Sequence, residues 1–126
     1  MSGDNSRKQH GFSKQVRLRK QAEFDRVFSG KVYAANGVLV MNGCRNDLAR
    51  SRIGLSVSRK VGNAVVRNRW KRLIREGFRT QQSDLPRGLD IIVRPRRGAT
   101  PDFQAIQSSI RSLAERIAGK LLESRS

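Results

Sequence analysis

The stretch VVRNRWKRLIREGFR at residues 65–79 constrains the fold of this chain more than any other. On an α-helix, at about 100° per residue, its apolar side chains gather within an arc of about 140° and its cationic ones fill the remainder. The apolar arc comprises Val66, Trp70, Leu73, Ile74, Gly77 and Phe78. Because such an arc must be buried, the segment predicts an amphipathic helix packed on a sheet.

The other arc carries six cationic side chains and a single acid, Glu76. Arg67, Lys71, Arg75 and Arg79 recur every four residues, where like charges repel by roughly 0.2–0.5 kcal/mol per pair. One interpretation is an ordinary solvated face, but such faces usually mix signs. Arg outnumbers Lys five to one, and a guanidinium suits bidentate contacts with phosphate. The pattern favours a nucleic acid as partner.

The whole chain is also strongly basic. Its 126 residues contain 27 Lys+Arg and 10 Asp+Glu, which gives a formal charge of +17. Because so many like charges repel one another, we expect the protein to bind a polyanion. This length fits one small domain. There is no apolar run of about 18 residues and no signal-peptide core at the N-terminus, so we expect a cytoplasmic protein without membrane contact.

The sequence offers little for protein-based catalysis. Its one cysteine, Cys44, and one histidine, His10, provide neither a zinc cluster nor a nucleophile and base pattern. Asp25, Asp47 and Asp90 are interpreted as surface or strand-end groups. We therefore expect no catalytic residue and no metal site in this chain.

The first half of the chain predicts an arm, a helix and strands. Residues 1–15 are polar and predict a disordered arm, followed by one domain over residues 16–123. In KQAEFDRVFSGK, Phe24, Val27 and Phe28 have helical spacing, which predicts a short helix that ends at Gly30. KVYAANGVLVMNGC has strand composition around Asn36-Gly37, which predicts a turn or bulge with positive φ, in either a strand pair or one long bent strand.

The second half predicts two strands and two helices. RIGLSVSRK alternates as a strand with one buried face, and Asn63 is the expected N-cap of the Arg-rich helix. LDIIVRP predicts a strand buried on both sides. Thr100 is expected to cap a long helix that ends near Leu122. The order αβββαβα predicts an α+β two-layer sandwich, with about four strands in a small mixed sheet and three helices.

The segment GLSVSRKVGNAVVRNRWKRLIREGFR at residues 54–79 resembles the signature of the bacterial ribonuclease P protein component. RLRKQAEFDRVFSGK resembles the first helix of that family, with its two spaced Phe, and LDIIVRPR its last strand. The resemblance implies a left-handed crossover between the parallel strands that flank the Arg-rich helix, where pattern reasoning alone predicts a right-handed one. The first 15 residues have no counterpart.

The resemblance implies an accessory subunit of ribonuclease P, in which an RNA removes the 5′ leader of precursor tRNA. The expected partners are ribonuclease P RNA and precursor tRNA, with no obligate protein partner. Mg²⁺ is expected to act mainly through the RNA. The alternative from the residues alone is another basic RNA- or DNA-binding module, such as a ribosomal protein. A stand-alone nuclease would need side chains that the sequence does not bring together.

The resemblance also implies two sets of site residues. The expected contacts with the catalytic RNA are Arg59, Lys60, Arg67, Asn68, Arg69, Lys71, Arg72 and Arg75. A cleft between the first helix, the sheet and the Arg-rich helix is expected to hold the leader, with Phe24, Phe28, Ser56 and Met41 as its lining. For the two Phe, core packing of a short helix is an equal alternative. Met41 stands where the family often has an aromatic residue, and we expect weaker or more apolar contacts there.

Overall fold

The computed structural model describes residues 16–125, so the predicted arm at 1–15 lies outside the described residues. Its first half contains α2 (Gln21–Ser29), β1 (Tyr33–Ala35), β2 (Leu39–Arg45) and β3 (Arg52–Leu55). Its second half contains α3 (Ala64–Arg79), β4 (Leu89–Pro95) and α4 (Phe103–Arg125). Short 3-10 turns lie at Arg59–Val61 and Gln82–Asp84. The predicted order αβββαβα is confirmed.

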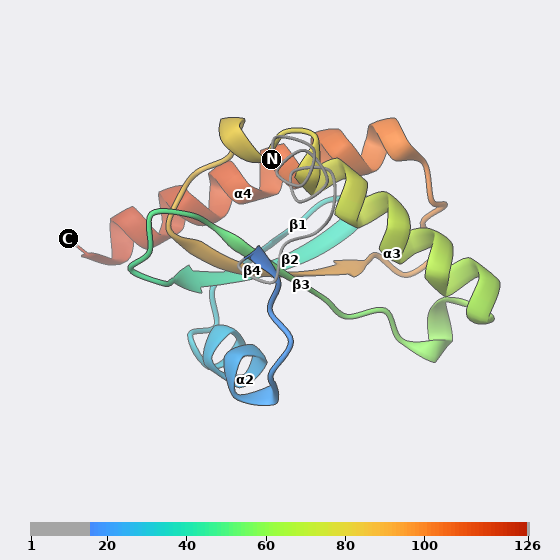
Figure 1. The fold of residues 1–126 in the computed structure, drawn as a ribbon, viewed down its shortest axis with the longest axis horizontal. Helices are drawn as coiled ribbons and strands as arrows, with labels where there is room; N and C mark the ends of the chain where they lie inside the picture. Colours follow the sequence, from blue (N-terminus) through green and yellow to red (C-terminus); the bar gives the residue numbers. More distant parts are fainter. Residues whose placement is uncertain (1–15, 126) are drawn as a thin grey trace, which may run out of the picture.

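The four strands form one mixed sheet in the order β1-β2-β4-β3. β2 pairs antiparallel with both β1 and β4, whereas β3 pairs parallel with β4. α3 therefore lies in the connection between two parallel neighbours. β4 is central, and its first five residues are buried, as its apolar run predicted. Figure 1 shows α2 on one side of the sheet and α3 and α4 on the other.

β1 and β2 form a hairpin, the first of the two alternatives that the sequence allowed. The turn depends on the Asn36 side chain, whose Oδ1 accepts hydrogen bonds of 2.9 Å from the N–H groups of Val38 and Leu39. The positive φ expected at Asn36-Gly37 is wrong, since neither residue has one. An Asx turn satisfies the backbone donors here without left-handed backbone.

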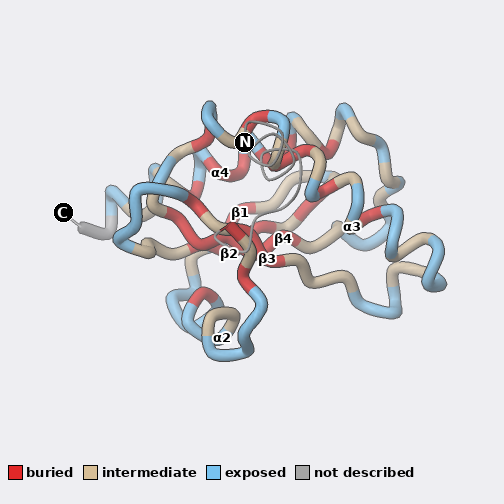
Figure 2. The backbone as a smooth tube through the Cα atoms, viewed as in Figure 1, coloured by how far each residue is buried: buried red, intermediate tan, exposed pale blue. Residues whose placement is uncertain are grey.

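The main core lies between the sheet and the pair α3 and α4, and Figure 2 shows buried backbone in all of these elements. From α3, Trp70, Ile74 and Phe78 are at most 1% exposed, which confirms the predicted apolar arc. From α4 the core takes Ile106, Ile110, Leu113 and Ile117. Gly77 lets the two helices approach, because a Cβ there would lie 3.1 Å from Ile110 Cδ1.

α4 begins later than expected. The sequence predicted Thr100 as the cap, but the first helical residue is Phe103. Asp102 Oδ2 accepts a hydrogen bond of 2.9 Å from the N–H of Ala105, so Asp102 caps the helix instead. A carboxylate at this place satisfies a free N–H and also interacts favourably with the helix dipole.

A smaller apolar cluster fastens α2 to the opposite face of the sheet. It consists of Leu18, Val27 and Ile92, with Phe24 and Cys44 packed against it. Gly54 of β3 makes room for this packing, because a Cβ there would lie 2.7 Å from Phe24 Cζ. Gly54 therefore serves the close approach of α2.

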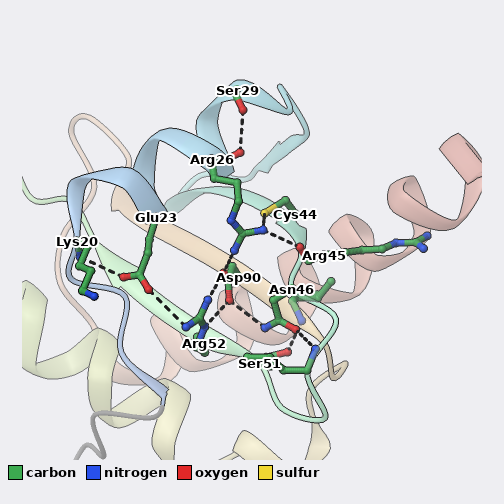
Figure 3. A network of polar contacts seen from close by, with 12 residues as sticks. Lys20, Glu23, Arg26, Ser29, Cys44, Arg45, Asn46, Ser51, Arg52 and Asp90 are labelled. Carbon is green, nitrogen blue, oxygen red and sulfur yellow. Dashed lines mark hydrogen bonds and ion pairs between the residues drawn. The ribbon is translucent and has the colours of Figure 1, made fainter.

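Asp90 anchors α2 by charge as well. It lies beside the start of β4, as a strand-end group would, but its interpretation as a surface group is wrong. Its side chain is 0% exposed and forms ion pairs with Arg26 of α2 and Arg52 of β3 (Figure 3). Arg52 donates at 2.9 and 2.7 Å, and Asn46 donates at 2.9 Å. Burial opposes ionisation, but the hydrogen bonds from Arg52 and Asn46 and the two cationic charges outweigh it and lower the pKa of Asp90.

Candidate nucleic-acid interface

The N-terminus of α3 is built by a short connection from β3. Asn63 caps the helix as predicted, because its Oδ1 accepts a hydrogen bond of 3.0 Å from the N–H of Val66. The 3-10 turn that precedes it carries Arg59 and Lys60, both exposed. The backbone thus brings these two predicted RNA contacts close to the start of the Arg-rich helix.

The cationic face of α3 is defined here as Arg67, Asn68, Arg69, Lys71, Arg72 and Arg75. Arg67 and Lys71 are half-buried and the other four are exposed. Arg67 Nε donates to the Gly62 carbonyl at 3.2 Å, which fixes the stem of that side chain. All six predicted RNA contacts on α3 therefore share one accessible face.

This face has almost no internal charge compensation. Within residues 16–125, none of its five cations has an ion pair with a described acid, and the one acid of the helix, Glu76, binds Arg79 in the next turn. The i, i+4 repulsion along Arg67, Lys71 and Arg75 therefore stays unrelieved in the described chain. Phosphate groups would relieve it, which supports the interpretation of this face as a polyanion-binding surface.

A second group of residues lies on the α2 side of the sheet and is called here the Phe28 surface: Phe28, Asn42, Ser56 and Arg94. Asn42 lies at its base and is only 8% exposed. Phe28 is 37% exposed, and Arg94 Cζ lies 6.0 Å from the centroid of its ring. Arg94 Nη2 donates to Asn42 Oδ1 at 3.1 Å. Arg94 Nε is buried and has no hydrogen-bond partner among the described residues. An exposed ring beside an under-used guanidinium is suited to base stacking and to oxygen acceptors.

The predicted lining of the cleft is only partly accessible. Ser56 follows β3 and its N–H donates to the Val93 carbonyl at 3.0 Å, so strand alternation places its side chain on the α2 side. Phe24 belongs to the apolar cluster under α2, whereas Phe28 is exposed. Of the two alternatives for this pair, Phe24 therefore packs in a core and Phe28 stays available.

The prediction that Met41 lines the cleft is wrong. Met41 is 0% exposed and belongs to the main core, on the α3 and α4 side of the sheet. Side chains alternate along β2, so the neighbouring Asn42 takes the place on the α2 side. Sequence reasoning missed both Asn42 and Arg94. The sequence signal that could have identified them is the presence of a polar side chain within a mostly apolar strand, Asn42 in β2 and Arg94 in β4.

Among residues 16–125, no three His, Cys, Asp or Glu side chains come together as a metal site would require. Glu23, Glu76 and Asp90 are each engaged by an arginine. In the same part of the chain, no helix has the length and apolar character to cross a membrane.

An α+β sandwich with an uncompensated Arg-rich helix beside a mixed sheet belongs to the class of basic proteins suited to binding a nucleic acid. The particular family follows from comparison with known proteins. The family model described as Ribonuclease P matches residues 12–118, and the chain belongs to the ribonuclease P protein family. Its role is accordingly that of a protein subunit of the ribonuclease P endoribonuclease, in tRNA processing.

Proteins similar in sequence and proteins similar in structure both belong to this family. The ribonuclease P protein component of Lachnoclostridium phytofermentans is 41% identical over 99 residues, which cover 78% of this chain and 85% of the relative. The RNase P protein of Staphylococcus aureus is similar with a TM-score of 0.70 at 38% identity, covering 82% and 94% of the two chains. The RNase P protein of Thermotoga maritima is similar with a TM-score of 0.71 at 33% sequence identity, and the match covers 79% of this chain and 96% of the Thermotoga chain.

Proposed function

We propose that this chain binds ribonuclease P RNA through the cationic face of α3 and thereby assists RNA-catalysed cleavage of precursor tRNA in the cytoplasm. The observation that carries the proposal is that five cations on one helix face lack an acidic partner in the described chain. Bound RNA would release condensed counterions from its phosphates and relieve the repulsion among these side chains. Arg59 and Lys60 would extend the contact beyond the N-terminus of the helix.

We further propose that Mg²⁺ acts through the RNA. The described residues gather no set of three metal-ligating side chains, so the protein would lower the Mg²⁺ requirement indirectly, by neutralising phosphates that Mg²⁺ would otherwise screen. The chemistry that the metal supplies is activation of the water that attacks the phosphodiester. The contribution of this chain is binding and orientation.

The Phe28 surface is proposed to hold the single-stranded 5′ leader of precursor tRNA. An exposed ring can stack on a base of any sequence, and Arg94 adds a cation next to it. Asn42 and Ser56 add polar groups at the same face of the sheet. These contacts favour one unpaired strand with modest sequence preference.

The proposed function predicts rescue of RNA catalysis at low Mg²⁺. A bacterial ribonuclease P RNA should cleave precursor tRNA slowly at low Mg²⁺ alone and much faster with this chain, whereas the chain alone should not cleave. The measurement is the single-turnover rate across a Mg²⁺ titration, with and without protein. Absence of rescue with a cognate RNA, despite tight RNA binding, would favour a different basic module. Cleavage by rigorously RNA-free protein would instead indicate a nuclease.

The leader proposal predicts a selective effect of Phe28→Ala. Loss of one stacking partner costs about 1–3 kcal/mol per base, so the affinity of the holoenzyme for precursor tRNA should fall by about 5-fold to 150-fold. Binding of tRNA without a leader should stay unchanged. The measurement is the Kd of both RNAs at one salt concentration.

Leu48→Ala is the matched control, because Leu48 is 38% exposed and Phe28 is 37% exposed. It removes a similarly exposed apolar side chain from the loop after β2. Equal weakening of precursor and leaderless tRNA by Phe28→Ala would contradict leader binding at this surface and indicate a general loss of structure.

A further inference from the structure

A small hollow lies where the segment that precedes α2 passes between β3 and α3. Its volume is about 150 Å³. Four cationic side chains line it, Arg17, Arg19, Lys71 and Arg75, over an apolar floor of Ile53 and Leu55. The sequence assigned RNA contacts to Lys71 and Arg75 but none to Arg17 or Arg19.

The backbone fixes the two arginines of the segment against the edge of the sheet. Arg17 forms a parallel bridge with Ile53, and the N–H of Leu18 donates to the Ile53 carbonyl at 2.9 Å. Leu18 points into the apolar cluster under α2, where it is 4% exposed. In an extended segment, residues two apart lie on the same side, so Arg17 and Arg19 lie together.

The hollow concentrates positive charge without an acid. None of its lining residues is Asp or Glu, and within the described chain none of its four cations has an ion pair. The neighbouring hollow shares Arg17 and Arg19 with this one, but it also contains an acid, because Glu23 lines it together with Lys20 and Arg52. Lys71 and Arg75 repel one another at i, i+4, and the apolar floor reduces screening between them.

We propose that this hollow binds one backbone phosphate group of RNA and so clamps residues 17–19 onto α3. The tetrahedral phosphate offers several acceptor oxygens, which suits guanidinium and ammonium donors that converge from two separate segments. The hollow is large enough for a phosphate group with some of its hydration. The identification of RNA as the source of the phosphate rests on the proposed function. The binding of a phosphate group at the hollow does not depend on that function.

The first test titrates the full chain with inorganic phosphate at constant ionic strength, with chloride as the replacement anion. Loss of one charge-assisted contact should raise the Kd for phosphate about tenfold in Arg17→Gln and in Arg19→Gln. Arg111→Gln should bind like the parent chain, because Arg111 lies on α4 and pairs with Glu115. The measurement is calorimetry, with the phosphate-dependent rise in Tm as a second readout.

Equal Kd values in Arg19→Gln and Arg111→Gln would overturn the proposal, since phosphate would then act only through net charge. So would the absence of any phosphate effect beyond that of chloride. A thermal unfolding curve without phosphate identifies a variant that fails to fold, and the remaining variant of the pair then carries the test.

The second test identifies RNA as the occupant. With ribonuclease P RNA, Arg19→Gln should lower the slope of log K against log salt by about 0.7–0.9, the value for one lost phosphate contact. Arg111→Gln should leave the slope unchanged. An unchanged slope in Arg19→Gln, with phosphate binding weakened, would overturn RNA as the occupant. Failure of the parent chain to bind the RNA would refute the proposed function, and the phosphate titration would still report on the hollow.

Discussion

Asp90→Ala should lower the free energy of unfolding by about 3 kcal/mol, the largest loss of stability expected from a single polar side chain here. Removing one partner of a buried ion pair typically costs about 3–5 kcal/mol. The lower end applies because Arg26 and Arg52 keep 46% and 21% side-chain exposure and regain some hydration. The variant also leaves a donor of Asn46 without its acceptor. Urea denaturation of the two proteins measures the difference.

Asp25→Ala is the matched control in the same part of the fold. Asp25 is exposed on α2 and accepts one hydrogen bond of 2.8 Å from Gln21. An exposed substitution of this kind should change stability by less than about 0.5 kcal/mol. If the two alanine variants lose equal stability, the cause is the change in net charge and the ion-pair network is not decisive.

Acid titration gives a second readout of the same network. The folded-state pKa of Asp90 is lowered, so the carboxylate adds stability above its unfolded pKa of about 3.9. That stability is lost as the pH falls through the lower, folded-state value. The stability difference between the parent chain and Asp90→Ala should therefore be full above about pH 5 and shrink toward low pH. A difference that stays constant down to pH 2 would contradict this account.

The sequence predicted α3 and β4 well because burial dictates their patterns strongly. In α3 the apolar arc and the N-cap both follow from local spacing, and Trp70 and Asn63 lie as expected. The continuous apolar run of β4 could only be central in a sheet, and β4 pairs on both sides. The local pattern of apolar residues was therefore sufficient to predict these two elements and the side chains that they bury.

Asp90 was misjudged because its partners are distant in sequence. Arg26 and Arg52 lie 64 and 38 residues away, and no local pattern connects them to a carboxylate within an apolar run. Only the pairing of β3 with β4 and the docking of α2 bring the three together. The buried charge would otherwise be unfavourable, so the network is a consequence of tertiary structure.

Met41 was misplaced because strand alternation makes register decisive. A shift of one residue moves a side chain to the opposite face of the sheet. The hairpin turn at Asn36 sets the register of β2 and places Met41 in the core and Asn42 on the other face. Arg94 was missed for a related reason, since its neighbour Phe28 comes from α2, and local spacing does not show which strand residues that helix meets.

The largest functional effect is expected from reversing charge on α3, with Arg69→Glu and Arg72→Glu combined. Both side chains are exposed and have no ion pair with a described acid, so stability should change little. Each lost contact with phosphate costs about 1.5–3 kcal/mol, so the affinity for ribonuclease P RNA should fall about a hundredfold or more. The salt slope should also fall by about 1.4–1.8.

The matched control reverses two exposed arginines of α4, with Arg111→Glu and Arg116→Glu combined. It changes the net charge by the same amount, so the long-range attraction of RNA weakens equally in both variants. Direct contacts are lost only in the α3 variant if the cationic face binds RNA. Equal affinities and equal salt slopes for the two variants would refute that interface, because the protein would then attract RNA by net charge alone. A large loss confined to the α3 variant would explain why one helix carries both a buried apolar arc and a dense cationic one.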